Sequence, residues 1–226
     1  MNQENKSTVI FSFLFFWTYC FLNGFFNPYL ANYMVLFLIT DILFWAIYPI
    51  LNIYYLVFDK KIISFNDLGF KKSIFKRKSF LLIVFISFFV TIFLNNSYWN
   101  LRDILLQILP NNYFQSFDYQ SIISKSGEKA IYLTFFFAFT AGFTEEIYYR
   151  SILRILINQG KFHILKYVFI SSILFSMNHW EGGIINIIST LFFGISCSVL
   201  YLIFGNIWPL IIGHIITDII AFFPYD

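Results

Sequence analysis

The stretch IINIISTLFFGISCSVLYLIF, residues 184–204, is 21 residues long and has no charged side chain. A helix of about 20 predominantly apolar residues is long enough to cross the hydrocarbon core of a bilayer. We therefore expect this stretch to be a membrane-spanning helix, and the rest of the chain to be built around such helices.

The composition of the whole chain supports this expectation. Of its 226 residues, 59% are hydrophobic and only 12% are charged, whereas soluble domains carry about 25% charged residues. One soluble core of this size cannot hide so much apolar surface, so lipid must cover part of it. The sequence predicts an all-α, polytopic transmembrane helical bundle in the cell membrane.

Apolar runs of suitable length occur about seven times along the chain, and we expect each to be a helix. The expected spans are Thr8–Phe26, Tyr33–Val57, Phe80–Leu94, Ala130–Ile157, Tyr167–His179, Ile184–Phe204 and Trp208–Phe223.

Basic residues predict the orientation of these helices. The loop 58–79 contains seven Lys or Arg residues, whereas the polar connection 95–129 contains three. Because cytoplasmic loops are enriched in Lys and Arg, the loop 58–79 and the N-terminus are expected in the cytoplasm, and the connection 95–129 outside. The sequence LRDILLQIL, residues 101–109, is expected to be either an amphipathic surface helix or a linker.

The same distribution makes nucleic acid an unexpected partner, because the basic residues adjoin the spans instead of forming a separate patch. Cys20 and Cys197 each lie in an apolar run and show no disulfide or metal-binding spacing. They are predicted to be buried free thiols.

Charged residues occur in GFTEEIYYRSIL, residues 142–153, where a charge at the bilayer centre costs about 3 kcal/mol or more. Glu146 and Arg150 are four residues apart on a helix and can form an ion pair. Glu145 is rotated by about 100° from Glu146, with Tyr149 four residues after it. One glutamate would neutralise the arginine while the other is available as a general base. The alternative is that all three only hold helices together.

The sequence LFSMNHW, residues 174–180, places His179 four residues after Phe175. If residues 130–157 and 167–179 form an antiparallel hairpin that closes at residue 162, Glu145 and His179 each lie 17 positions from the turn. With a helical rise of about 1.5 Å per residue, they would lie at the same depth. A lone histidine at the end of a span also has an ordinary interpretation, a hydrogen bond at the interface.

A third polar pair follows in GHIITDII, residues 213–220, where His214 and Asp218 share a helix face. An interhelical hydrogen bond or a cap cluster would explain this pair alone. The three groups together are too many polar residues for packing alone. Before residue 130, Asp41 is the one comparable residue in the expected spans. We therefore expect a catalytic cavity built from the last three or four helices, and the role of Asp41 is open.

The ordered motifs E-E-x-x-x-R, F-x-x-x-H and H-x-x-x-(N/D) resemble those of the CAAX protease and bacteriocin-processing family. This family, also called Abi, contains intramembrane endopeptidases of the CAAX prenyl protease 2 type. The resemblance divides the chain into N-terminal spans with their loops, residues 1–129, and a catalytic core, residues 130–223. Asp218 departs from the asparagine that is usual in the prenyl-protein proteases.

The resemblance implies a glutamate-type endopeptidase. Glu145, aided by His179, would activate a water, and His214 with Asp218 would stabilise the oxyanion. Arg150 would fix Glu146. The two residues implied in the substrate cavity are Tyr149 and Phe175.

Metallopeptidase chemistry is the runner-up. Glu145, His179 and His214 could supply the three protein ligands of a catalytic zinc, although the chain lacks the H-E-x-x-H spacing of common zinc proteases. No cofactor is firmly implied.

The substrate implied is a membrane-associated peptide or protein. Richness in Phe, Ile, Asn, Tyr and Lys is typical of AT-rich bacterial genomes, which favours bacteriocin processing or self-immunity over cleavage of prenylated proteins. Two other functions stay open: a non-catalytic immunity or scaffold membrane protein, and a small transporter, because buried carboxylates also form ion pathways.

Overall fold

The computed structural model describes residues 2–71, 77–109, 115–124, 126–158 and 162–223. Helices account for most of these residues, and the one β-contact among them is an isolated antiparallel bridge between Gln115 and Gly182. The predicted all-α fold is confirmed.

The chain begins with two long antiparallel helices. The first is α1, Gln3–Leu30, which starts where the side chain of Asn2 accepts a hydrogen bond from the backbone N–H of Asn5. The second contains two π-helical segments and consists of α2 (Met34–Asp41), η1 (Ile42–Ile47), α3 (Tyr48–Tyr54) and η2 (Tyr55–Asp59).

The third helix, α4, Arg77–Ile108, is longer than predicted. We expected it to end at Leu94, but it continues through the polar residues that follow, so LRDILLQI is the last part of α4 and neither a separate surface helix nor a linker. No glycine or proline interrupts this stretch, and Tyr98, Trp99 and Arg102 line a cavity in the protein. Polar side chains therefore continue a helix whose apolar run has ended.

A short helix, α5 (Tyr119–Ser124), leads into residues 130–157, which are helical throughout as predicted. They divide into α6 (Ala130–Glu145), the π-helical segment η5 (Glu146–Ile152) and α7 (Leu153–Ile157). The next helix, α8, is His163–Met177, so it begins and ends before the predicted range. His179 consequently lies in the connection 178–182 and not on the helix.

Two helices complete the fold, α9 (Gly183–Phe204) and α10 (Trp208–Phe222). Between them, Gly205 has a φ of +54°, a left-handed conformation that glycine adopts without strain and that commonly ends a helix. Pro209 follows in the first turn of α10, where its missing N–H costs nothing.

Four helical stretches of the described chain are long and apolar enough to cross a membrane: Gln3–Leu30, Met34–Asp59, Phe80–Ile108 and Gly183–Phe204. The stretches His163–Met177 and Trp208–Phe222 are apolar but shorter. Together with the exposed large hydrophobic side chains on many helices, they identify a membrane helical bundle. Which end faces the cytoplasm stays a prediction, and part of the basic loop, residues 72–76, lies outside the described residues.

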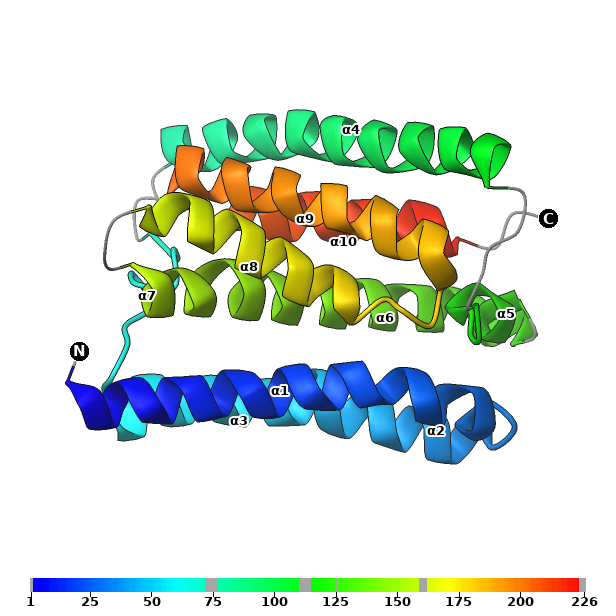
Figure 1. Ribbon diagram of the computed structural model, residues 1–226, viewed down its shortest axis with the longest axis horizontal. Coiled ribbons are helices and arrows are strands. Elements are labelled where there is room, and N and C mark those ends of the chain that lie inside the picture. The colour runs from blue at the N-terminus through cyan, green and yellow to red at the C-terminus, as the bar shows by residue number, and fades with distance from the viewer. Residues whose placement is uncertain (1, 72–76, 110–114, 125, 159–161, 224–226) are drawn as a thin grey trace.

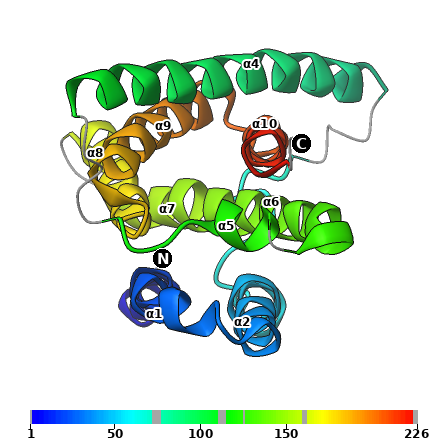
Figure 2. The ribbon, with the colours of Figure 1, turned by 90° about the vertical axis from the view of Figure 1, so that its right-hand side faces the viewer.

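The helices are arranged in layers (Figure 1). Helix α1 and the α2–α3 helix run side by side at one edge of the bundle, and α4 forms the opposite edge, where it packs on α9 and α10. Figure 2 shows α4 crossing the other helices obliquely, with α6–α7 between α10 and the N-terminal pair. Cys20 and Cys197 are both buried free thiols, as predicted.

Helices α6 and α10 approach each other closely at Gly142. A Cβ atom at this position would lie 2.6 Å from Ile215 Cγ1 and 3.0 Å from the backbone nitrogen of Ile215. The absence of a side chain at Gly142 thus lets the helix that carries Glu145 pack directly against the helix that carries His214.

Candidate active site

Glu145 and Glu146 lie where α6 passes into the π-helical segment η5. A π-helical turn holds an extra residue, and such turns occur frequently at functional sites. Both glutamates are buried, Glu146 completely. Glu145 lines a cavity of about 420 Å³, whereas Glu146 is not among the residues that line it. The two adjacent carboxyl groups therefore have different surroundings.

Glu146 forms the expected ion pair with Arg150, with 3.2 Å between Oε2 and Nε. The side chains of both residues are completely buried. Arg150 also donates from Nη1 to Ser171 Oγ at 3.1 Å, and its guanidinium lies 4.7 Å from the ring centroid of Phe175. A buried arginine needs such compensation, because an unpaired buried charge is costly.

His214, on α10, connects the two glutamates. Its Nδ1 lies 2.9 Å from Glu146 Oε1, so this nitrogen carries a hydrogen and donates it to the carboxylate. Its Nε2 lies 3.6 Å from Glu145 Oε2 and 3.6 Å from Asp218 Oδ2. A lone pair facing two carboxylates would be repelled, so a proton is needed on Nε2 or on one of the two carboxyl groups.

His179 approaches Glu145 from the other side. Its Nδ1 lies 2.8 Å from the backbone oxygen of Phe175, to which it donates. Its Nε2 is then free to accept a hydrogen bond, and it lies 4.0 Å from Glu145 Oε1. The hairpin geometry predicted from the sequence thus brings these two side chains together although His179 lies beyond the end of α8.

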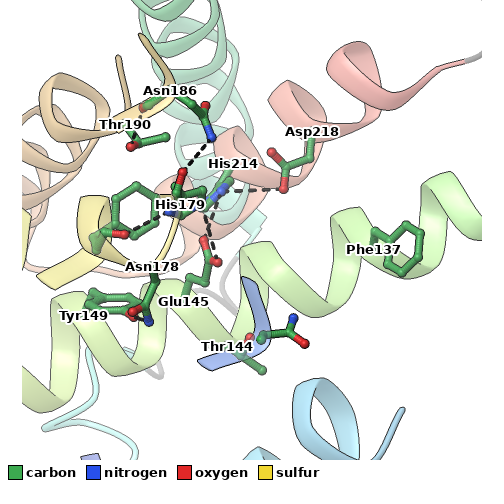
Figure 3. A network of polar contacts seen from close by, with 12 residues as sticks. Phe137, Thr144, Glu145, Tyr149, Asn178, His179, Asn186, Thr190, His214 and Asp218 are labelled. Carbon is green, nitrogen blue, oxygen red and sulfur yellow. Dashed lines mark hydrogen bonds and ion pairs between the residues drawn. The ribbon is translucent and has the colours of Figure 1, made fainter. Parts of the chain in front are cut away.

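Figure 3 shows the carboxyl group of Glu145 and the imidazoles of His179 and His214 directed toward one another, with Asp218 beyond His214. All four residues line the cavity, as does Phe175. Tyr149 does not line it, although it was predicted in the substrate cavity. The Tyr149 hydroxyl accepts a short hydrogen bond from Asn178 Nδ2 and is buried behind the site.

Several neutral residues that position the site were not predicted. Asn178 bonds to Tyr149, and Asn186 donates from Nδ2 to the backbone oxygen of His179 at 3.2 Å. Tyr98 in turn donates to Asn186 Oδ1 at 2.9 Å. The position of Asn178 next to His179 was the available signal. Nothing in the sequence marks Asn186 or Tyr98 as partners of residues so far away along the chain.

A further acidic residue, Glu181, lines the cavity in the connection between α8 and α9. Its backbone oxygen accepts hydrogen bonds from the backbone nitrogens of Ser116 and Phe117, at 2.8 and 3.1 Å. Burial raises the pKa of the Glu181 carboxyl to about 7. Near neutral pH this group thus carries a proton in part of the molecules.

The predicted zinc ligands have the right chemistry, since His179 and His214 each have an Nε2 directed to Glu145. Their arrangement does not fit a metal ion, however. Within the described part of the chain, no group of three or more His, Cys, Asp or Glu side chains is placed so that it could hold one. We therefore derive no step through a metal.

Fold and site together define a class of protein: an all-α membrane bundle in which carboxyl and imidazole groups from α6, α10 and the α8–α9 connection share one cavity. Residues 127–220 match the family described as type II CAAX prenyl endopeptidase, Rce1-like. This part of the chain is thus similar to type II CAAX prenyl endopeptidases, which agrees with the resemblance that the motifs indicated. No curated protein and no solved structure matches the chain.

Proposed function

We propose that this protein is an intramembrane endopeptidase in which Glu145 and His179 activate a water that hydrolyses a peptide bond. The observation that carries the proposal is the convergence of Glu145, His179 and His214 on one cavity, with 4.0 and 3.6 Å from the Glu145 carboxyl oxygens to the two Nε2 atoms. The family match over residues 127–220 supports the same reaction.

The gap between Glu145 Oε1 and His179 Nε2 suits one water molecule, because a bridging water accommodates polar atoms that are too far apart for a direct hydrogen bond. With Nδ1 of His179 committed to Phe175, both groups accept hydrogens from that water. The lone pairs of the water oxygen then point away from both. This orientation prepares the oxygen for attack on a carbonyl carbon.

In the chemical step, the water oxygen adds to the scissile carbonyl carbon and one of its protons passes to Glu145. The carbonyl oxygen becomes an oxyanion, which the N–H at Nε2 of His214 stabilises. Collapse of this intermediate breaks the C–N bond, and Glu145 returns its proton to the leaving amine. The products are a carboxylic acid and an amine, so no co-reactant besides water is consumed.

Glu146, Arg150 and Asp218 act through His214. Glu146 accepts from Nδ1 and thereby directs Nε2 toward Glu145, while Arg150 holds Glu146 in place. Asp218, 3.6 Å from Nε2, favours a proton on that nitrogen, which is the form that can donate to an oxyanion. An aspartate at this position thus assists the oxyanion step without contacting the oxyanion.

The substrate class is a membrane-associated peptide or protein that reaches the cavity from the bilayer. The proposal includes a multi-pass arrangement in the cell membrane with the N-terminus and the loop 58–79 in the cytoplasm, as the distribution of basic residues suggests. Bacteriocin processing or self-immunity is the biological setting that the sequence favours.

The experiment uses the purified full chain in nanodiscs with a mixture of hydrophobic peptides, and mass spectrometry detects the cleavage products. Glu145→Gln and His179→Ala are each expected to lower kcat by about 10²-fold or more, with thermal unfolding checking that the variants fold. Asp103→Asn, an exposed carboxyl outside the cavity, is the matched control. Undiminished cleavage by Glu145→Gln would refute the proposal.

The same variants separate hydrolysis from the other two functions. Expressed in cells exposed to a toxic peptide, folded but inactive variants that still protect would indicate binding alone. A proton-coupled flux in proteoliposomes that persists without cleavage would indicate a transporter.

A further inference from the structure

Asp41, at the end of α2, is a buried carboxyl group far from the acid–imidazole centre in sequence. It is 1% exposed, and neither of its side-chain oxygens has a hydrogen-bond partner in the described chain. Nor do any of the ion pairs found among these residues include it. Buried polar groups nearly always have partners, because desolvation without a hydrogen bond is costly.

The place of Asp41 indicates what the missing partner is. Asp41 lines the same cavity as Glu145, His179 and His214, but from the N-terminal helix pair. Asn23, on α1, lines it too, and its Oδ1 is buried without a partner while its Nδ2 donates to Tyr119. This part of the wall thus offers hydrogen-bond acceptors, together with an unpaired indole N–H from Trp45.

The charged side chains around the cavity are mostly acidic, as Asp41 is. Within the described chain, five carboxyl residues line the cavity against a single Lys or Arg, Arg102. The chain as a whole carries a formal net charge of +3, whereas carboxyl groups outnumber Lys and Arg around the cavity. The five are Asp41, Asp118, Glu145, Glu181 and Asp218.

We propose that Asp41 forms a subsite that binds a cationic side chain, lysine or arginine, of the peptide cleaved at Glu145. This subsite rests on the proposed endopeptidase function, because it uses the same cavity. A lysine ammonium offers three donors and an arginine guanidinium five, and neither is an acceptor. Such a group satisfies Asp41 and the free oxygen of Asn23 with charge-assisted hydrogen bonds.

The aromatic wall suits the same ligand. Trp45, Tyr119 and Phe137 line the cavity with Asp41, and aromatic surface covers the apolar stem of a lysine or arginine while the charged head reaches a carboxylate. The polar groups of the subsite, on Asp41, Asn23 and Trp45, belong to the first 59 residues, whereas the hydrolytic groups belong to residues 145–218. Asp41 therefore determines which peptides bind without taking part in the chemical step.

The test measures binding to the full chain in nanodiscs, in a Glu145→Gln background that prevents turnover. The probes are fluorescent hydrophobic peptides of one length in which a single lysine is moved along the chain, each paired with a peptide that has norleucine instead. Fluorescence anisotropy gives the two dissociation constants of every pair. At one lysine position, we expect the lysine peptide to bind about tenfold or more tightly than its partner.

Asp41→Asn and Asp41→Ser are each expected to remove this preference while the norleucine peptides bind as before. The control variant Asp103→Asn, which changes an exposed side chain, is expected to keep the preference for the lysine peptide. Without peptide, Asp41→Asn is expected to unfold at the same or a higher temperature, because it removes an unpaired buried carboxyl group. A lysine preference that survives in both Asp41 variants, or that is found at no position, would overturn the subsite.

Cleavage of the same peptides by the chain with intact Glu145 separates the subsite from the endopeptidase function. Cleavage that is independent of the lysine and of Asp41 refutes the subsite and leaves hydrolysis standing. Lysine-dependent binding that is lost in the Asp41 variants, without cleavage of any peptide, supports a cation subsite and refutes hydrolysis.

Discussion

The ion pair between Glu146 and Arg150 gives a prediction about folding that depends on burial. Both side chains are completely buried, and the pair spans 3.2 Å. Arg150→Met keeps most of the apolar volume and leaves the Glu146 charge with His214 as its remaining partner. Glu146→Gln is nearly isosteric, keeps an oxygen for the His214 N–H, and leaves the Arg150 charge uncompensated.

The expected magnitudes follow from the difference between breaking a buried pair and removing it. Removing one partner of a buried ion pair costs about 3–5 kcal/mol, because the other charge is left in a poorly polarisable interior. Replacing both partners removes the pair and its desolvation cost together, which is often nearly neutral. We therefore expect the double variant to be more stable than the sum of the single effects predicts, by about 2 kcal/mol or more.

The assay is reversible unfolding in mixed micelles, with SDS as the denaturant and tryptophan fluorescence as the signal, for the protein and the three variants. The four free energies of unfolding form a double-mutant cycle, which gives the coupling between the two side chains. Single variants that each cost less than about 1 kcal/mol, or free-energy changes that add, would contradict the conclusion that this pair is a buried and mutually dependent unit.

Four other results are expected. Dialysis against a metal chelator leaves peptide cleavage by the full chain unchanged, and recovery of lost activity by added zinc would instead support the metallopeptidase alternative. Gly142→Ala lowers the free energy of unfolding by about 1–3 kcal/mol, since its new methyl group meets Ile215 in α10; unchanged thermal unfolding would contradict this close approach. Tyr119→Phe lowers the free energy of unfolding by about 1–3 kcal/mol, because Asn23 and Asn27 both donate to the Tyr119 hydroxyl, and unfolding measurements check this change. Glu181→Gln makes the free energy of unfolding less dependent on pH. The pKa of the Glu181 carboxyl is raised from 4.5 to about 7 in the folded protein, so this group stabilises the fold at low pH, and the stabilisation is lost as the pH rises from 4.5 to about 7. Identical melting-temperature profiles for the variant and the protein would contradict this last expectation.

The helices could be predicted from the sequence because their apolar runs are long. The proximity of Glu145 and His179 could be predicted because two residues equally far from the turn of an antiparallel hairpin lie at the same depth in the membrane. The end of α4 could not be predicted in this way. Hydropathy marks where apolar residues stop, but residues 95–108 continue the helix with polar side chains. Some of these side chains line the cavity that holds Glu145, so their polarity does not signal a loop.

The residues of the site that could be predicted from the sequence are the charged and titratable ones. Glu145, Glu146 and Arg150 are conspicuous because charges are rare in apolar runs, and His179, His214 and Asp218 follow from helical spacing and the family motifs. Asn178 and Asn186 are neutral, and their roles depend on which distant residues they meet in the folded chain. Asp41 was noticeable in the sequence, but only the tertiary packing places it on the same cavity as Glu145.

The cavity wall includes Asp41 and Glu145, which lie on parts of the chain separated by more than a hundred residues. Such a division allows the two parts to diverge independently during evolution. A chimaera that takes residues 1–59 from a relative would inherit that relative's choice of peptide and keep its own bond-breaking apparatus. Recombination between paralogues is thus a simple route by which proteins of this architecture acquire new targets.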